Sequence, residues 1–303
     1  MISIIICSRS SDISSVLKEN IQNTIGIDYE IIVINNSENN YSIFSAYNKG
    51  VNLSNFPYLC FVHEDVLFRT NDWGNELIGH LKDRNTGIIG IAGGKVMTKI
   101  PAQWSSEGKY KNIIQHRKNK VYTWKEPQGF QGISQSAILL DGVFLSMRRE
   151  LFDKISFDEK IKGFHGYDCD ICAQSIIAGF TNYVVYDILL EHFSGGNGDA
   201  QFYNNLITIY KKWEEHLPLL SPDVPDIIRS RIDKIEIKRL RKLIAKMVST
   251  GFSTKSIVKN ASYFVGILDT NEAKKILIHI RLKIFFLRLF RKPKYLFCKS
   301  VYS

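Results

Sequence analysis

The stretch "YLCFVHEDVLF", residues 58–68, places three ionisable side chains between two apolar runs. Residues 58–62 are apolar or aromatic, as expected of a strand that is buried on both faces. His63, Glu64 and Asp65 follow directly, and the apolar pattern then resumes. The interior of a buried strand offers no partners for three successive polar groups, so we expect them at the strand's end, where a ligand can reach them.

The segments around this strand predict an alternating α/β fold. Residues 2–7 and 31–34 are short apolar runs typical of buried parallel strands, and helices are expected over residues 14–25 and 45–53. Another strand is expected at residues 88–92. Polar clusters follow the strands, with "CSRS" after the first and "NNSE" after the second. This alternation predicts a doubly wound α/β sheet whose ligands bind beyond the carboxyl ends of the strands.

One long segment departs from the alternation. Residues 99–132 contain Trp104 and Trp124 among lysines, glycines and prolines, with little periodicity. Long irregular segments inside compact domains are usually functional loops, so we expect a lid that closes over the substrate and excludes water. A helix is then expected to begin near "GYDCD", residues 166–170, and to end at Gly179.

The charge of the chain is uneven. Residues 221–303 carry 19 lysines and arginines against 6 acidic residues, whereas the rest of the chain carries 21 against 24. Three prolines between positions 218 and 225 mark a boundary. We therefore predict an α/β domain in residues 1–217 and a basic, mainly helical region in residues 218–303. Because the positive charge is confined to the second region, nucleic-acid binding is not expected of the main domain.

Composition and termini predict a cytoplasmic protein. Five cysteines without a framework of close spacings are typical of a reducing compartment. The chain begins like a strand rather than a signal peptide, and no uncharged apolar run approaches the ~20 residues that span a bilayer. The stretch "KKILIHIRLKIFFLRLFRKPKYLF", residues 274–297, interleaves cations with apolar side chains. It predicts either a peripheral contact with an anionic membrane surface or a helix packed on the domain or on a partner chain.

Two strand ends suggest a metal site. Asp65 is well placed to bind a divalent cation that neutralises a diphosphate, while Glu64 alternates to the other face and could orient it or contact a ribose. His192 lies in "LLEHFSGG", where a polar residue and glycines again follow an apolar run. An imidazole with a carboxylate suits Mn²⁺ better than Mg²⁺, which prefers oxygen ligands. Taken singly, the two motifs are also compatible with a solvated strand end and an ordinary hydrogen-bonded histidine.

The "GYDCD" box supplies two candidate bases. Asp168 and Asp170 lie two residues apart, so on a helix their side chains diverge by about 200° and cannot serve one point. One is expected to face the crevice as a general base, and simple capping of the helix N-terminus is the alternative. Cys169 and Cys172 fall on the buried stripe of the same helix, which favours core packing over redox or zinc chemistry.

Taken together and in this order, the motifs resemble the family-2-like glycosyltransferases with the GT-A fold. The resemblance covers roughly residues 1–215 and implies a GT-A, nucleotide-diphospho-sugar transferase-like domain in residues 1–217, followed by a C-terminal helical extension. It rests on "SIIICSRS" (3–10), "EIIVINNSE" (30–38), "SAYNKG" (45–50), "FVHEDV" (61–66), "LDGVFLSMRRELF" (140–152), "GYDCD" (166–170) and "EHFSGG" (191–196).

The resemblance also implies roles for individual residues. Asp168 matches the family's general base, and Asp65 with His192 matches the ligands of Mn²⁺ or Mg²⁺. Trp104, Asp141 and Gly142 are expected on the acceptor side. The donor-binding positions are Ser8, Arg9, Asn35, Asn48, His63, Glu64 and Asp65.

The sequence departs from the family pattern at three places. His63 replaces the first acid of the family's D-x-D motif. Asn35 and Asn36 replace a usual pair of aspartates, and Tyr167 replaces the glutamate that precedes the base.

The implied reaction is an inverting transfer of a hexose-type sugar from a nucleotide-diphospho-sugar donor to a hydroxyl of a glycan or lipid-linked acceptor, in polysaccharide or glycan assembly. Two other classes of protein share some of these features. A sugar nucleotidyltransferase would have the same α/β start, but it would carry a glycine-rich phosphate loop where this chain has "CSRSSDIS". A non-enzymatic carbohydrate-binding protein is the second alternative, since His63 could mark a lost metal site.

Overall fold

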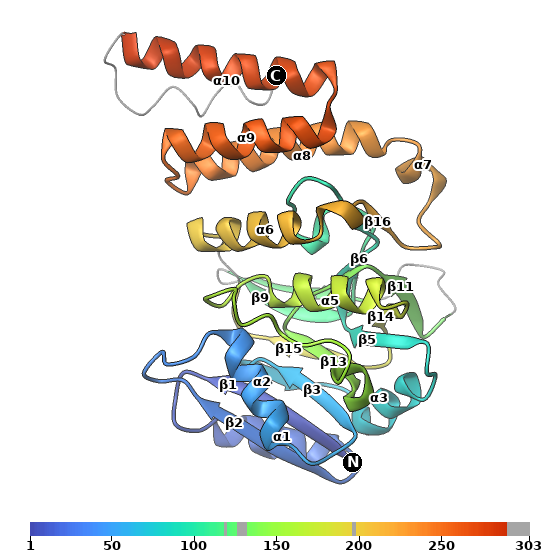
Figure 1. Ribbon diagram of the computed structural model, residues 1–303. Helices are drawn as coiled ribbons and strands as arrows, with labels where there is room; N and C mark the ends of the chain where they lie inside the picture. Colours follow the sequence, from blue (N-terminus) through green and yellow to red (C-terminus); the bar gives the residue numbers. More distant parts are fainter. Residues whose placement is uncertain (118–119, 126–131, 196–197, 290–303) are drawn as a thin grey trace. The chain divides into compact units, whose positions relative to one another are not determined.

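The structure of the protein, a computed structural model, describes residues 1–117, 120–125, 132–195 and 198–289 (Figure 1). The chain divides into two compact units, and a single cut does not separate them. The short strand β16 (Leu219–Leu220) pairs with β7 (Val96–Met97) and so belongs to the first unit. The boundary after residue 217 between a catalytic domain and a C-terminal helical region stays a prediction. The first unit comprises Met1–Met97, Trp104–Asn197 and Leu219–Val224, and the second comprises Thr98–Gln103, Gly198–Pro218 and Pro225–Ser303.

A seven-stranded mixed sheet forms the centre of the first unit, in the order β11, β14, β5, β13, β3, β1, β2 (Figure 1). β1 pairs in parallel with β2 and β3, whereas β13 runs antiparallel to β3 and β5. The predicted α/β sheet is therefore confirmed, with an antiparallel strand at its middle. The strands span Ile2–Ser8 (β1), Tyr29–Asn35 (β2), Tyr58–Val62 (β3), Thr86–Gly90 (β5), Ser134–Ala137 (β11), Phe144–Arg148 (β13) and Thr181–Val185 (β14).

Helices cover both faces of this sheet. The helix α1 (Ser15–Thr24) begins where the Ser14 hydroxyl accepts a hydrogen bond from the Leu17 amide, and it packs with α3 (Trp73–Leu81) on one face. The helix α2 (Ile43–Leu53) lies close against β1, since a Cβ on Gly50 would stand 2.3 Å from the side chain of Ile5. The remaining helices of this unit are α4 (Arg149–Phe152) and α5 (Tyr167–Ile177).

The helix α5 confirms two predictions. It is followed by Gly179, whose φ of +90° is a conformation that favours glycine. Cys169 and Cys172 are buried free thiols on its inner face, as expected of core residues.

One expected strand is confirmed in part, and one expected irregular segment was wrong. The predicted strand at residues 88–92 is divided, because β5 ends at Gly90 and β6 (Ala92–Gly94) pairs with other partners, β12 (Leu139–Leu140) and β8 (Lys109–Lys111). The predicted loop at residues 99–132 contains paired strands rather than a structureless lid. Besides β8 they are β9 (Ile113–Arg117) and β10 (Lys120–Trp124), after a 3-10 turn at Trp104–Ser106; residues 118–119 and 126–131 lie outside the described residues. β9 and β10 pair with each other as a hairpin, whereas β8 pairs with β6 and β9 also pairs with β15 (Leu190–His192), a more distant segment.

A second, four-stranded sheet carries the segment that follows His63, Glu64 and Asp65. Its order is β10, β9, β15, β4, where β4 is Val66–Phe68 and β15 is Leu190–His192. β15 runs antiparallel to β4 and parallel to β9. This sheet therefore brings three remote stretches of the chain side by side.

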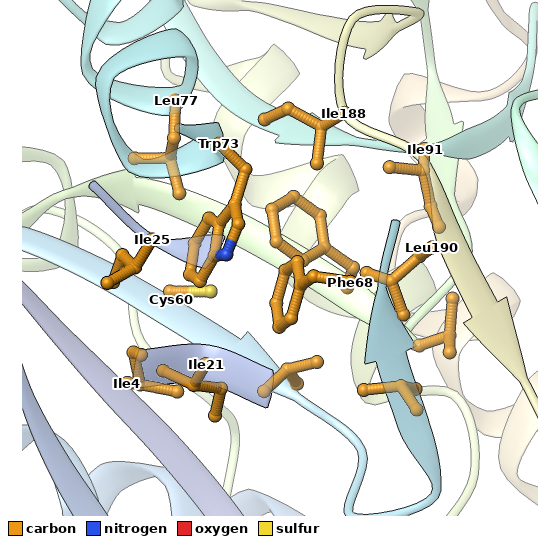
Figure 2. Close-up of a cluster of buried hydrophobic side chains, with 14 of the residues drawn as sticks. Ile4, Ile21, Ile25, Cys60, Phe68, Trp73, Leu77, Ile91, Ile188 and Leu190 are labelled. Carbon is orange, nitrogen blue, oxygen red and sulfur yellow. The ribbon is translucent and has the colours of Figure 1, made fainter. Parts of the chain in front are cut away.

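An apolar cluster beneath the main sheet fixes β4 in place (Figure 2). The ring of Phe68 stacks on Trp73 with centroids 3.9 Å apart and planes 5° apart, and both side chains are buried. The Asn20 side chain exchanges two hydrogen bonds with the Phe68 backbone, at 2.7 and 3.0 Å. The strand β4 is thus held in place by the packing of the Phe68 ring and by hydrogen bonds to the Phe68 main chain.

The second unit is helical and has its own core. Buried apolar residues on α6 (Ala200–Lys212), α8 (Ile232–Ser249) and α9 (Thr254–Leu268) pack together, with further contributions from α10 (Asn271–Leu289). Glu236 accepts hydrogen bonds from the amides of Lys99 and Ile100 at 2.6 and 3.0 Å, and burial raises the pKa of this carboxyl to about 7. Shorter elements are η2 (Glu214–His216) and α7 (Asp226–Arg229). Within the part of the chain that is described, no helix is both long and apolar enough to cross a bilayer.

Removing the Phe68 ring should destabilise the first unit. We expect Phe68→Ala to lower its free energy of unfolding by about 3–5 kcal/mol, because the ring leaves a cavity beside Trp73. Val121→Ala is the control, since this side chain is 59% exposed on β10 and should change stability by less than about 0.5 kcal/mol. Urea unfolding measures both, and equal midpoints for the two variants would contradict the assigned role of Phe68.

Candidate active site

Strand register brings two remote ionisable residues together. Asp65 immediately precedes β4, and His192 ends β15 directly opposite Val66. The Phe193 amide donates to the Asp65 carbonyl at 3.0 Å and extends this ladder by one bond. The same pairing places His192 beside Gln115 of β9. The predicted pair of Asp65 and His192 therefore lies at one place in the structure.

His63 joins this pair. One donor atom from each of His63, Asp65 and His192 lies within 4.8 Å of the others. His192 Nε2 is 3.4 Å from Asp65 Oδ1, and His63 Nδ1 is 3.9 Å from the same oxygen. Two imidazole nitrogens and one carboxylate suit Mn²⁺ better than Mg²⁺. The residues present therefore fit a divalent cation, with His63 as a third ligand that the sequence suggested only as a donor contact.

The pKa shifts of Asp65 and His63 are consistent with metal binding. Burial alone would raise the pKa of Asp65, but the neighbouring His192, Ser194 and His63 hold that pKa well below its usual range. Burial and the neighbouring His192 lower the pKa of His63. At neutral pH the carboxylate is ionised and the His63 ring is neutral, which are the forms that bind metals.

Part of the predicted donor side meets at the carboxyl ends of β1 and β3. Glu64 accepts a hydrogen bond from Ser8 Oγ at 2.5 Å and from the Arg9 amide at 3.2 Å. Glu64 therefore orients the turn after β1, while Asp65 faces the histidines. Ser8 is buried and the Arg9 side chain is exposed.

Asn35 and Asn48 are engaged in local contacts. Asn35 is exposed, and its Oδ1 accepts from the Ser37 amide at 3.0 Å. Asn48 donates to the Phe157 carbonyl and to Glu159, and it accepts from the Phe157 amide, so its side-chain amide is fully used. Contacts of these two residues with a donor stay predictions.

The structure distinguishes the two aspartates of α5. Asp170 is completely buried, and its carboxylate accepts from Gln174 at 2.9 Å. Asp168 is partly exposed and accepts from the amides of Cys169 and Gly142 at 2.9 and 3.3 Å. Burial and the negative charge of Asp141 raise the pKa of Asp168 to about 7. Of the two, Asp168 is the carboxyl that is partly exposed, and its raised pKa suits it to accept a proton near neutral pH.

Two of the three predicted acceptor residues, Asp141 and Gly142, lie close to Asp168. The Gly142 amide binds its carboxylate, and Asp141 accepts from the Val143 amide at 3.0 Å. Trp104 and Trp124 flank the ammonium group of Lys111, whose nitrogen lies 5.5 and 4.0 Å from their ring centroids. Burial lowers the pKa of Lys111, and the negative charge of Asp141 partly offsets this effect.

Sequence reasoning missed Gln115, Lys111 and the contact made by Tyr167. Gln115 and Lys111 lie in the stretch expected to be irregular, where no strand alternation pointed to them. Tyr167 stands where the family pattern has glutamate, and its hydroxyl lies 2.8 Å from His63 Nε2. The signal that could have found it is that His63 and Tyr167 are both departures from that pattern.

Comparisons with known proteins bear on the family and the fold. Residues 3–189 match the model of a family described as "Glycosyltransferase like family". No curated protein matches the chain.

Solved structures resemble the protein in fold, at low sequence identity. Residues 1–349 of S. aureus TarS, in complex with UDP-GlcNAc, are 12% identical with a TM-score of 0.54, covering 93% of this chain and 87% of TarS. GalNAc-T7 with UDP, GalNAc and Mn²⁺ is 13% identical with a TM-score of 0.50, covering 77% of this chain and 54% of GalNAc-T7. Because the family match spans more than half of the chain, and the sheet and helices agree with these structures, the protein belongs to the glycosyltransferase-like family and has the GT-A fold.

Proposed function

We propose that this glycosyltransferase moves a hexose-type sugar, with inversion, from a nucleotide-diphospho-sugar to a hydroxyl of a glycan or lipid-linked acceptor in polysaccharide or glycan assembly. The proposal rests on two features of one unit. Asp168 is a partly exposed carboxyl with a pKa of about 7, and His63, Asp65 and His192 form a cluster that fits a divalent cation. TarS binds UDP-GlcNAc, and GalNAc-T7 binds UDP, GalNAc and Mn²⁺, which supports the donor class and the cation.

Asp168 acts as the general base in this proposal. It accepts the proton of the acceptor hydroxyl as that oxygen attacks the anomeric carbon, and a pKa near 7 makes it a competent base at neutral pH. Inversion requires the base and the leaving diphosphate on opposite faces of the sugar. The amides of Gly142 and Cys169 hold the carboxylate in place during this transfer.

The donor lies across the ends of β1 and β3. His63, Asp65 and His192 would hold Mn²⁺, which when bound supplies positive charge to the departing diphosphate. Glu64 keeps the Ser8–Arg9 turn in position for the nucleotide through the hydrogen bonds described above.

The acceptor is expected on the other side of the sugar. Trp104 is partly exposed and is proposed to stack on a sugar ring, while Trp124, stacked on Tyr122, holds the Lys111 ammonium beside it. These groups lie on or beside paired strands, so they are held ready for an acceptor.

The C-terminal region is proposed to contact an anionic membrane surface. The helix α10 exposes Ile278 and Leu282, one turn apart, beside the exposed cations Lys275 and Arg281. Apolar and basic groups on one exposed helix suit the interfacial region of a bilayer. Residues 290–297 of the basic stretch lie outside the described residues. This contact would place the enzyme at the inner face of the membrane, in the cytoplasm.

Asp168→Asn should abolish sugar transfer while leaving nucleotide binding nearly intact. Loss of a general base typically costs about 10²–10⁴ in rate. In the wild type, the rate should rise tenfold per pH unit below about 7 and level off above it, because only the ionised carboxylate accepts a proton. Product formation followed from pH 5.5 to 8.5 measures both effects. Persistent turnover in the variant, or a flat profile in the wild type, would identify a different base.

Asp65→Asn should remove the metal-dependent part of nucleotide binding. A nucleoside diphosphate with Mn²⁺ at about a hundred times its dissociation constant should stabilise the wild type by roughly 2.7 kcal/mol, seen as a rise in Tm. The variant should lose the increment that Mn²⁺ adds. Asp153→Asn, an exposed surface change, is the control and should keep it. An Mn²⁺ increment that survives in Asp65→Asn would exclude this carboxylate as a ligand.

Reversing charge on α10 should weaken binding to anionic vesicles. Lys275→Glu with Arg281→Glu is expected to reduce flotation with phosphatidylserine liposomes, at about 1 kcal/mol for each charge removed. Lys234→Glu with Lys238→Glu makes the same charge change on exposed positions of α8 and is the matched control. Equal flotation of both double variants, or no flotation of the wild type, argues against a membrane contact through α10.

A further inference from the structure

His63 makes a hydrogen bond through its Nε2 atom, and the proposed reaction does not use this bond. His63 Nε2 lies 2.8 Å from Tyr167 Oη, and the Tyr167 hydroxyl donates to the Gly142 carbonyl at 2.9 Å. A hydroxyl has one proton, so when Tyr167 donates it to Gly142 it can only accept from His63. His63 therefore carries its ring proton on Nε2. The lone pair of Nδ1 is left on the side of Asp65.

His192 is held in the opposite way. Its Nδ1 lies 3.1 Å from Gln115 Oε1. The Gln115 amide nitrogen lies 3.1, 3.2 and 2.5 Å from the carbonyl oxygens of His116, His192 and Ser194, which accept only from a nitrogen and share its two protons. Gln115 must then offer its oxygen to His192, so Nδ1 carries the ring proton. The lone pair of Nε2 is left 3.4 Å from Asp65.

We propose that Tyr167 and Gln115 are positioning residues that fix opposite tautomers on His63 and His192. The two lone pairs then converge with the Asp65 carboxylate on one divalent cation. The proposal deepens the metal site of the proposed function and rests on it. Partners of this kind hold a ligating imidazole in the tautomer and orientation that bind the metal.

Tyr167 is rigid enough for this role. Its ring contacts Phe44, Tyr47 and Phe157, at centroid distances of 6.3, 5.5 and 6.1 Å. A Cβ on Gly142 would stand 2.2 Å from the Tyr167 oxygen, so the hydroxyl fits only because this residue is glycine. The site for the cation is thereby prepared before the cation arrives.

Tyr167 also connects the cation site with the base. The Gly142 carbonyl accepts from Tyr167, and the Gly142 amide donates to the next residue of α5, Asp168. Hydrogen bonds through Tyr167 and Gly142 therefore link His63 to Asp168. Loosening Tyr167 should disturb cation binding first, because it contacts a ligand directly.

The first test is the tautomer state of the metal-free protein. Long-range ¹H–¹⁵N spectra at pH 8.5 with EDTA should show His63 as the Nε2–H form and His192 as the Nδ1–H form, with signals assigned from His63→Gln and His192→Gln. In Tyr167→Phe, which keeps the ring, His63 should lose its preference. Tyr210→Phe is the matched control, since this buried hydroxyl also donates to a carbonyl, that of Ala102 at 3.0 Å. A wild-type His63 in the Nδ1–H form, or one unchanged by Tyr167→Phe, would overturn the proposal.

The second test is Mn²⁺ binding without nucleotide, followed by the electron paramagnetic resonance signal of free Mn²⁺. Tyr167→Phe and Gln115→Met should each weaken binding about 10–100-fold, whereas Tyr210→Phe should not change it. Thermal unfolding in EDTA checks that every variant is folded. Unchanged affinity in both site variants would refute the roles assigned to these residues. Absence of transferase activity in a wild type that passes both tests would instead refute the proposed function alone.

Discussion

The antiparallel pairing of β4 with β15 is the interaction on which the site depends. It sets Val66 opposite His192 and so brings Asp65 next to an imidazole from a distant part of the sequence. Side chains alternate along a strand, so a slip of one residue would turn His192 to the other face and empty the cluster. The burial of Phe68 against Trp73 prevents such a slip, and the core thereby fixes the chemistry at the surface.

Two carboxyl groups of this site have pKa values displaced in opposite directions. Asp65 lies among imidazoles and stays ionised, whereas Asp168 lies in a buried setting beside Asp141, and its pKa is raised. Environments that separate two titratable groups in this way typically separate their roles. A permanently ionised carboxylate suits a cation, and one that titrates near neutrality suits proton transfer. The proposed roles of Asp65 as a metal ligand and Asp168 as a base thus rest on the burial and the neighbours of each carboxyl.

The three departures from the family pattern differ in consequence. His63 and Tyr167 touch each other, so an imidazole in place of an acid comes with the hydroxyl that orients it. A carboxylate can bind a metal through either oxygen, whereas an imidazole must have the correct nitrogen free. Asn36, by contrast, exchanges two hydrogen bonds with the Tyr41 backbone and shapes the turn after β2.

The sequence alone determined the α/β alternation and the strand at residues 58–62, and it predicted the proximity of Asp65 and His192; Asp168 as the base stays a proposal. Strand ends and helix starts can be predicted from neighbouring residues, because apolar runs stop at polar residues. Only the tertiary structure decided the antiparallel β13, the strands within residues 99–132, and the contacts of Gln115 and Tyr167 with the histidines. Apart from the local hairpin of β9 and β10, those features depend on register between segments far apart in the chain, and such pairing leaves no local periodicity from which to predict it.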